Sequence, residues 1–174
     1  MSFAVRRLDA EDIEAYREIR LEALVVEPTA FTSDHASEAS LTADEWQGRL
    51  ERNHVFGTFD GDRLVGVATF FLESREKARH RGHVVAVYMR PEARGRGAGR
   101  GLMEAVIAEA RGKATQLHLG VTVGNEAARR LYERVGFQIY GVDPRALRID
   151  GRYYDEHLMV RLLDEAPGKK NDNA

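Results

Sequence analysis

The sequence predicts a fold of the α/β (α+β) class, in which one mixed, mostly antiparallel sheet carries helices on both faces. Apolar runs and turn signals follow one another in the order β-α-α-β-β-β-α-β-α-β-β. The second half contains strand–helix–strand crossovers, and such crossovers run their strands in the same direction. The chain has 174 residues, which suits a single domain with a full hydrophobic core.

The first half predicts two helices placed ahead of a strand meander. A helix over about 10–27 begins with Asp9 as its cap, and a second helix over about 42–52 begins with a capping box of Thr42 and Glu45. The other expected segments of this half are strands over 3–7, 54–59, 63–72 and 84–89, a loop or broken helix over 28–40, a turn at 60–62 and an exposed connection over 74–81.

The second half predicts strands and helices in alternation. A helix that follows a Gly-rich turn has Gly112 as its left-handed cap, and Asn125 caps a further helix that Gly136 ends. The expected strands cover 116–123, 137–140 and 153–162, and the last two are joined by a loop over 141–152 that turns at Asp150-Gly151. We expect one domain over residues 1–163 and a flexible tail over 164–174.

Composition excludes several classes of protein. Hydrophobic residues make up 43% and charged residues 31% of the chain, which is typical of a globular domain. A formal net charge of −2 gives no basis for nucleic-acid binding. The absence of cysteine excludes thiol catalysis, and the histidines lack metal-ligand spacing, so we expect no metal. Neither a signal peptide nor a membrane-spanning run is present, which predicts a cytoplasmic protein with no membrane partner.

The segment over 84–103 is the most informative part of the chain. It predicts a buried strand, a turn rich in Gly and Arg, and then a helix. Glycines let a ligand approach bare backbone, and the N–H groups and dipole of a helix start favour an anion, above all a phosphate. Arginines at positions 90, 94, 96 and 100 add positive charge around the turn, although the glycines alone could form a plain tight turn.

Two motifs in this region carry a family resemblance. Arg94-Gly95-Arg96-Gly97-Ala98-Gly99 is similar to the phosphate loop of the GNAT superfamily of acetyl-CoA-dependent N-acetyltransferases, Gln/Arg-x-x-Gly-x-Gly/Ala. The segment over 125–137 resembles the family's Asn-x-x-Ala-x-x-x-Tyr-x-x-x-Gly-Phe segment. The resemblance covers the element order over 3–162 and the motif detail over 83–137. It implies a GNAT-like single domain whose parallel central strands splay apart at a bulge, which we expect near Val87.

The resemblance also implies acetyl-CoA as cosubstrate and a role for particular residues in binding it. Main-chain groups of Val87 and Met89 would hydrogen-bond the pantetheine arm, as an added strand does. Asn125 would contact the cofactor, and Tyr132 would lie near its sulfur. The loop that would hold the pyrophosphate comprises Arg94, Gly95, Arg96, Gly97, Ala98, Gly99 and Arg100.

The implied reaction moves an acetyl group to a primary amine of a small molecule, an amino acid or a protein N-terminus, by direct attack through a tetrahedral intermediate. Tyr132 would protonate the leaving sulfur, since a phenol of pKa ~10 keeps its proton at neutral pH. The backbone N–H of Val87 would meet the oxyanion. His83 is the leading candidate for the base, because alternation places it on the strand face of Val87 and Met89.

Other residues are weaker candidates, and several have simpler explanations. Glu73 and Tyr88 are secondary candidates for the base. Phe31 and Ser33, together with Glu73, are expected to line the acceptor pocket. Core packing is the alternative for Tyr132 and the simpler explanation for Phe31, and His83 is alternatively a residue at the surface end of a strand.

Two other functions use the same sequence features. One is a non-catalytic acyl-CoA-binding or regulatory module of the same fold. The other is a nucleotide-binding protein that uses the same anion site, although the chain lacks the Gly-Lys-Ser/Thr ending of a P-loop. Homodimerisation is compatible with any of these functions.

Overall fold

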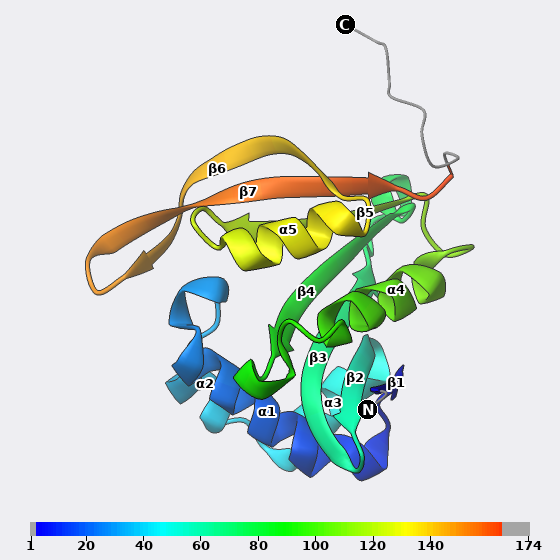
Figure 1. Cartoon of the computed structure of the whole chain (residues 1–174), viewed down its shortest axis with the longest axis vertical. Helices are drawn as coiled ribbons and strands as arrows, with labels where there is room; N and C mark the ends of the chain where they lie inside the picture. Colours follow the sequence, from blue (N-terminus) through cyan, green and yellow to red (C-terminus); the bar gives the residue numbers. More distant parts are fainter. Residues whose placement is uncertain (1–2, 165–174) are drawn as a thin grey trace, which may run out of the picture.

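The computed structural model describes residues 3–164, which form a seven-stranded sheet with helices on both faces (Figure 1). The strand order is β1-β2-β3-β4-β5-β7-β6. Neighbouring strands are antiparallel except for β4 and β5, which are parallel. This confirms the predicted class and its parallel central pair.

The elements follow the predicted order, with short helices added in the connections. The strands are β1 (Ala4–Arg7), β2 (His54–Asp60), β3 (Arg63–Leu72), β4 (Arg81–Met89), β5 (Gln116–Thr122), β6 (Gln138–Ile149) and β7 (Arg152–Leu162). The helices are α1 (Ile13–Val26), α2 (His35–Ala39), α3 (Ala43–Arg52), α4 (Ala98–Ala110) and α5 (Glu126–Arg134), with 3-10 turns η1 (Ala10–Asp12), η2 (Pro28–Ala30), η3 (Glu76–Ala78) and η4 (Pro91–Ala93).

Capping side chains fix where the first helices begin. The carboxylate of Asp9 accepts a hydrogen bond from the N–H of Glu11 at 2.9 Å, ahead of η1 and α1. Thr42 and Glu45 form the predicted capping box at the start of α3. Asp34 accepts the N–H of Ser37 at 2.9 Å and starts α2 inside the segment predicted as a loop or broken helix.

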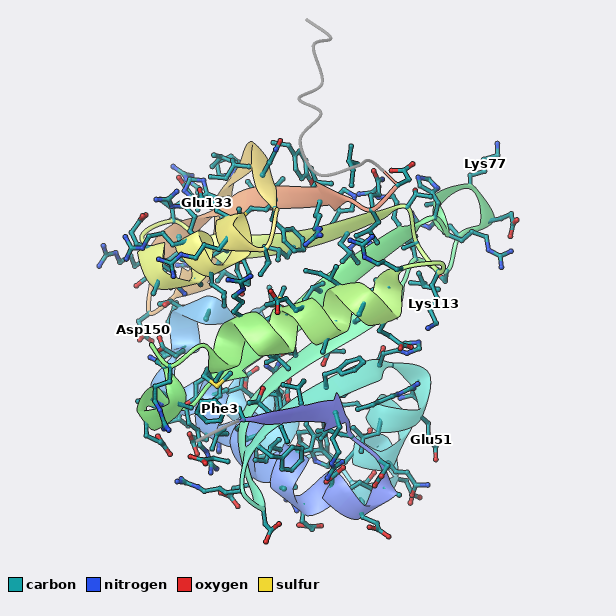
Figure 2. All side chains as sticks on the ribbon, turned by 45° about the vertical axis from the view of Figure 1, so that its right-hand side comes forward. Phe3, Glu51, Lys77, Lys113, Glu133 and Asp150 are labelled. Atoms are coloured by element: carbon teal, nitrogen blue, oxygen red, sulfur yellow. The ribbon has the colours of Figure 1, made fainter. Side chains whose placement is uncertain are left out.

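Each face of the sheet has its own hydrophobic core. Helices α4 and α5 cover one face, which we call the α4 face, and α1 and α3 cover the other, the α1 face. Figure 2 shows α4 lying across the strands. Fully buried side chains on the α4 face include Phe70, Leu102, Val106, Leu117 and Met159, and those on the α1 face include Ile19, Trp46, Val55 and Val67.

A bulge interrupts β4 where it pairs with β3. Val67 pairs with Tyr88 and Thr69 pairs with Val85, so β4 carries one extra residue between these two pairs. Ala86 lies there with a φ of +54°. This confirms the bulge predicted near Val87.

The bulge reverses the side-chain alternation of β4. Val84 packs into the α4-face core, and Val87 and Met89 pack against the same core, whereas Tyr88 belongs to the α1-face core. His83 stacks on Phe71 and lies on the α1 face. The prediction that His83 shares a strand face with Val87 and Met89 is therefore wrong, because the extra residue shifts the period of two.

Strands β4 and β5 are paired at one end only. Arg81–His83 of β4 pair with Gln116–His118 of β5, and no later residues of the two strands pair. Beyond this point β4 stays with β3 and β5 stays with β7. The sheet therefore opens between residues 84–89 of β4 and 119–122 of β5, an opening that we call the interstrand slot.

Strands β6 and β7 form a long hairpin with its turn at Asp150-Gly151, as predicted. Figure 2 places Asp150 at the tip of this hairpin, across the view from Lys113 at the far end of α4. The loop predicted over 141–152 is wrong, because β6 continues to Ile149. Pro144 and two register shifts obscure the alternation, and β6 tolerates both because it is the edge strand.

The described residues end at Asp164, so the tail predicted over 164–174 lies outside them except for this residue. The domain boundary at residue 163 stays a prediction. None of the helices in residues 3–164 is long and apolar enough to cross a membrane.

Candidate functional site

The backbone of β4 directs hydrogen-bonding groups into the interstrand slot. The N–H of Arg90 donates to the carbonyl of Val65 on β3 at 2.8 Å. Because neighbouring residues of a strand direct their polar groups to opposite edges, those of Val87 and Met89 point away from β3 and toward the slot. The carbonyl of Met89 accepts a hydrogen bond from Nε of Arg94 at 2.8 Å. The predicted contact of Val87 and Met89 with the pantetheine arm needs this orientation.

Backbone amide groups gather where the slot meets the start of α4. Gly97 is the helix N-cap with a φ of +85°, and its carbonyl accepts the N–H of Gly101 at 3.1 Å. The amides of Ala98 and Arg100 therefore precede the first helical hydrogen bond and lack an acceptor within the helix. A Cβ added at Gly95 or Gly97 would meet no atom within 4 Å. Free amides at a helix start with open space beside them suit a phosphate group.

Gly99 has a different environment from Gly95 and Gly97. A Cβ at Gly99 would lie 3.2 Å from Leu131 of α5, which makes this glycine a packing contact between α4 and α5.

The arginines around this loop are already engaged with carboxylates. Their partners are Glu27 for Arg94 (3.0 Å), Asp60 for Arg96 (3.8 Å), Glu104 for Arg100 (2.7 Å), and Glu18 and Glu22 for Arg90 (2.6 and 2.9 Å). The positive charge expected from the sequence is therefore largely compensated. An anion would meet backbone amides here rather than unopposed guanidinium groups.

Asn125 and Tyr132 lie at the two ends of one side of α5. Asn125 caps the helix, since its Oδ1 accepts the N–H of Ala128 at 3.2 Å. Tyr132 is 6% exposed and meets the ring of Phe137 edge-on. Burial raises the pKa of Tyr132 above the ordinary phenol value, so the hydroxyl keeps its proton at neutral pH. Within residues 3–164 this hydroxyl has no hydrogen-bond partner.

His83 lies at the closed end of the slot, on the α1 face. Its Nε2 is 3.5 Å from a carboxylate oxygen of Glu73, and its ring stacks on Phe71. His118 of β5 is its direct neighbour in the parallel pair, with ring centroids 5.9 Å apart. Burial, followed by the charges of Arg81 and other basic groups, lowers the pKa of His118 to about 4. His118 is thus neutral, and the structure brings together His83, Glu73 and His118.

Tyr88 is placed away from the slot. Its hydroxyl donates to Glu22 of α1 at 2.9 Å. Burial, together with that carboxylate, raises the pKa of Tyr88 to about 12. The suggestion that Tyr88 is a base therefore fails, because the bulge turns its side chain toward α1.

The expected acceptor residues lie in a segment tied to the open end of β5. The hydroxyl of Thr122 donates to the carbonyl of Thr29 at 2.5 Å, which fixes η2 beside the end of β5. Phe31 follows η2 but is buried beneath the guanidinium of Arg20 at 4.8 Å, as a core residue. Ser33 is exposed.

Sequence reasoning missed Glu156 of β7. Its carboxylate lies over Gly120 of β5, where a Cβ would be 2.9 Å from Oε2. Burial raises the pKa of Glu156, and Asp143 adds to this rise. A signal was available, since a glycine inside a predicted strand often marks the close approach of another group.

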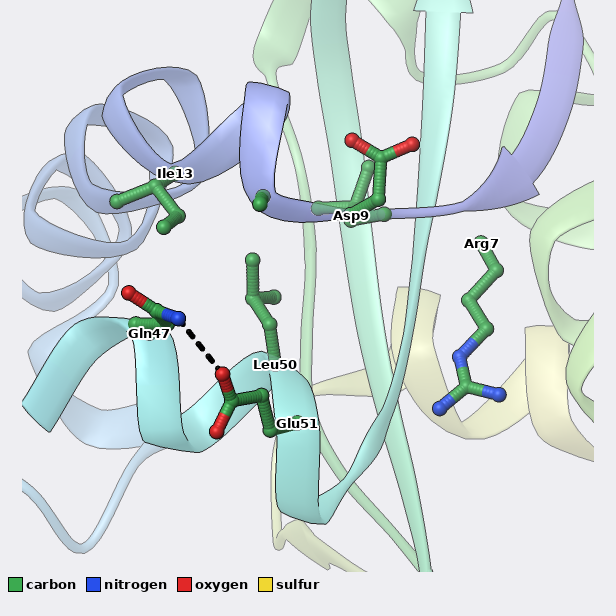
Figure 3. A pocket seen from close by; sticks show the side chains of 8 residues that line it. Arg7, Asp9, Ile13, Gln47, Leu50 and Glu51 are labelled. Atoms are coloured by element: carbon green, nitrogen blue, oxygen red, sulfur yellow. Dashed lines mark hydrogen bonds between the residues drawn. The ribbon is translucent and has the colours of Figure 1, made fainter. Parts of the chain in front are cut away.

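A separate pocket, shown in Figure 3, opens between the start of α1 and α3. It is lined by Arg7, Asp9, Ile13, Leu50 and a hydrogen-bonded pair, Gln47 and Glu51. Strands β2 and β3 separate β1 from the slot strand β4, so this pocket is distinct from the site. In the described part of the chain no group of three acidic or histidine side chains is placed to hold a metal ion.

Comparisons with known proteins agree with this architecture. The chain is 36% identical over 110 residues to the N-alpha-acetyltransferase RimI of Mycobacterium tuberculosis, covering 63% of this chain and 66% of that protein. It is 39% identical over 82 residues to an L-methionine sulfoximine/L-methionine sulfone acetyltransferase of Pseudomonas paraeruginosa, covering 45% and 46%. The chain thus spans less than two thirds of the length of either relative.

Solved structures extend the likeness to nearly the whole chain. The protein yncA from Salmonella typhimurium, solved with its cofactor acetyl-CoA, superposes with a TM-score of 0.82 at 25% identity, over 98% of this chain and 99% of that one. A ribosomal-protein-alanine N-acetyltransferase from Brucella melitensis gives 0.77 at 27% identity, over 92% and 99%. The profile of the acetyltransferase (GNAT) family matches residues 14–137. The chain therefore belongs to the acetyltransferase (GNAT) family.

Proposed function

We propose that this protein transfers the acetyl group of acetyl-CoA to a primary amine of a small molecule, an amino acid or a protein N-terminus. The observation that carries the proposal is the interstrand slot, which leads from the polar backbone of Val87 and Met89 to the amides at the start of α4. A slot edged by strand backbone suits an extended arm with amide groups, and the helix start suits its diphosphate. Family membership supports the same assignment.

The chain's own residues supply what acyl transfer requires. When bound, acetyl-CoA brings the acetyl group as a thioester. The amides over 95–100 hold the diphosphate, and the N–H of Val87 donates to the carbonyl oxygen as negative charge develops there. Tyr132 keeps its proton until the departing sulfur takes it, because burial disfavours the phenolate. Asn125 lies at the start of α5, which covers the α4 face of the sheet, and its side chain contacts the cofactor.

The acceptor class is tested with probes taken from the relatives. Isothermal calorimetry with coenzyme A should register binding, and thiol release from acetyl-CoA should follow when an amine is added. The panel contains L-methionine sulfone, a peptide with an N-terminal alanine, and free amino acids. Binding without release on any amine would favour a non-catalytic acyl-CoA-binding module. No heat with coenzyme A would exclude the proposed function.

Replacing Gly97 by Val is expected to weaken coenzyme A binding. The new side chain would enter open space beside the amides, and a φ of +85° strains any β-branched residue by about 1–3 kcal/mol. Loss of the diphosphate contacts should weaken affinity by more than about tenfold, the equivalent of roughly 1.4 kcal/mol. Calorimetry measures this change directly.

Gly112 provides the matched control for that substitution. It has a φ of +80°, also faces open space, and lies just past the other end of α4. Gly112→Val should cost similar stability in a thermal melt but leave coenzyme A affinity intact. Equal affinity in the two variants would show that the diphosphate does not bind at Gly97.

A further inference from the structure

We propose that Glu156 receives the acceptor's ammonium group and takes its proton, an inference that rests on the proposed function. The predicted base, His83, lies at the closed end of the slot, where β4 still pairs with β5. Another group must then serve an amine that reaches the open end of the slot. Glu156 lies there, directly opposite Thr122 near the end of β5.

The position of the Glu156 carboxylate depends on Gly120. A Cβ built on Gly120 would lie 2.9 Å from Oε2 and 3.4 Å from Cδ of Glu156. The carboxylate thus occupies the space that the side chain of any residue other than glycine would fill at position 120. It reaches from β7 across β5, which is the strand that borders the slot. Gly120 is itself exposed, so an incoming molecule can approach the carboxylate that lies over it.

Glu156 is a half-buried carboxylate without a cationic partner among residues 3–164. This contrasts with the arginine-paired carboxylates around the Gly- and Arg-rich loop over residues 94–100. Asp143 of β6 pairs directly with Glu156 and faces it, while β5 presents the uncharged Gly120 and Thr122. His118 and His83 lie farther along the same face, toward the closed end of the slot. A cationic amine would relieve the repulsion between the two carboxylates.

The chemistry of Glu156 matches the task. Burial, with Asp143 as the second cause, raises its pKa above that of an ordinary carboxyl group. A carboxylate of raised pKa is a stronger base for an ammonium proton. Its location on the α1 face places it across the sheet from Tyr132, which lies in the α4-face core. Proton acceptor and proton donor thus approach the reacting atoms from opposite sides.

The protons and bonds balance as follows. The ammonium gives one proton to Glu156, and the freed amine nitrogen forms the new bond to the acetyl carbon. The thioester carbon–sulfur bond breaks, and the sulfur takes the Tyr132 proton. The product nitrogen then loses its second proton, which restores Tyr132 through water. Glu156 releases its proton to solvent, so each turnover yields an amide, a thiol and one proton.

The test compares Glu156→Gln with the full-length wild-type protein, using L-methionine sulfone and a peptide with an N-terminal alanine. At pH 7 the variant should lose about 10²- to 10⁴-fold in kcat/KM, the usual contribution of a general base. The loss should shrink toward pH 9.5, because α-amino groups of pKa ~8 then lose their proton without help. Coenzyme A affinity should not change, because the diphosphate site is untouched.

Two further measurements separate this role from a structural one. Carbon-13 NMR of the Glu156 carboxyl should show a titration above the ordinary glutamate range in the wild-type protein, and added L-methionine sulfone should lower that midpoint. Glu51→Gln, the same change on an exposed part of α3, should leave the kinetics unaltered.

The outcomes are distinguishable. Wild-type rates in Glu156→Gln, or a loss of equal size at every pH, would overturn the role of Glu156 while leaving acetyl transfer established. If the wild-type protein binds no coenzyme A, or releases no thiol with any amine, the proposed function itself is wrong and this inference falls with it.

Discussion

Replacing Tyr132 by Phe is expected to lower the turnover number for acetyl transfer by about 10²- to 10⁴-fold, the range for loss of a general acid. The hydroxyl has no hydrogen-bond partner in residues 3–164, so its removal breaks no internal contact. The ring keeps its edge-on contact with Phe137. Coenzyme A affinity should therefore stay close to the wild-type value. Thiol-release kinetics and calorimetry on the same preparation measure the two quantities.

Tyr16 offers the matched control for this substitution. It is also a buried tyrosine, but it packs edge-on against Trp46 in the α1-face core, away from α5. Tyr16→Phe should leave the kinetics unchanged. If Tyr132→Phe reduced turnover and coenzyme A affinity in equal measure, Tyr132 would have a packing role only.

Replacing Glu38 by Gln is expected to destabilise the protein by about 3–5 kcal/mol, the cost of leaving a buried charge without its partner. Glu38 is 3% exposed and Arg20 is 6% exposed. Arg20 donates to the two carboxylate oxygens at 3.0 and 2.8 Å, and Arg49 donates at 2.8 Å. The substitution removes the charge that compensates both guanidinium groups. Urea denaturation at pH 7 measures the loss.

The ion cluster of Glu38, Arg20 and Arg49 makes the stability of the protein depend on pH. Burial acts to raise the pKa of Glu38, but the hydrogen bonds and charge of Arg20, aided by Arg49, bring it below the usual value. A carboxyl group with a lowered folded-state pKa contributes stability above its unfolded pKa of ~4.3, and this contribution is lost as pH falls through the folded value. The wild-type protein should therefore lose more stability than Glu38→Gln below about pH 4.

An exposed ion pair provides the control for the predicted loss of stability in Glu38→Gln. Glu76 and Arg79 form an ion pair in which both side chains are well exposed. Glu76→Gln should leave the denaturation midpoint nearly unchanged, because exposed pairs contribute little. A similar small effect in Glu38→Gln would mean that Arg20 regains solvent when its partner is removed.

Local signals predicted the parts of the fold that local chemistry decides. Asp9, Thr42 and Asn125 cap helices where expected, because a capping side chain acts on amides two or three residues away. Asp150-Gly151 turns the last hairpin for a similar reason. The predicted strand, Gly-rich turn and helix over residues 84–110 follow one another as expected, with Gly97 as the N-cap of α4.

Features that depend on distant partners could not be predicted. The exact bulge at Ala86 follows from the register between β3 and β4, and it reversed the face assigned to His83. The arginines of the Gly- and Arg-rich loop over residues 94–100 meet carboxylates mostly from other elements, such as Glu27 at the end of α1. Glu156 crosses β5 from a strand that is adjacent in space but separated in sequence. The type of a residue alone does not predict which distant residues it will contact in the fold.

Beyond His83 and His118, the facing edges of β4 and β5 have no partner strand among residues 3–164. In the proposed function, acetyl-CoA lies along this edge of β4 on the α4 side, and Glu156 receives the amine on the α1 side. Under that proposal both reactants would be bound together, and the polypeptide would not need to carry the acyl group covalently between them. A protein without a single cysteine is well matched to such a ternary encounter.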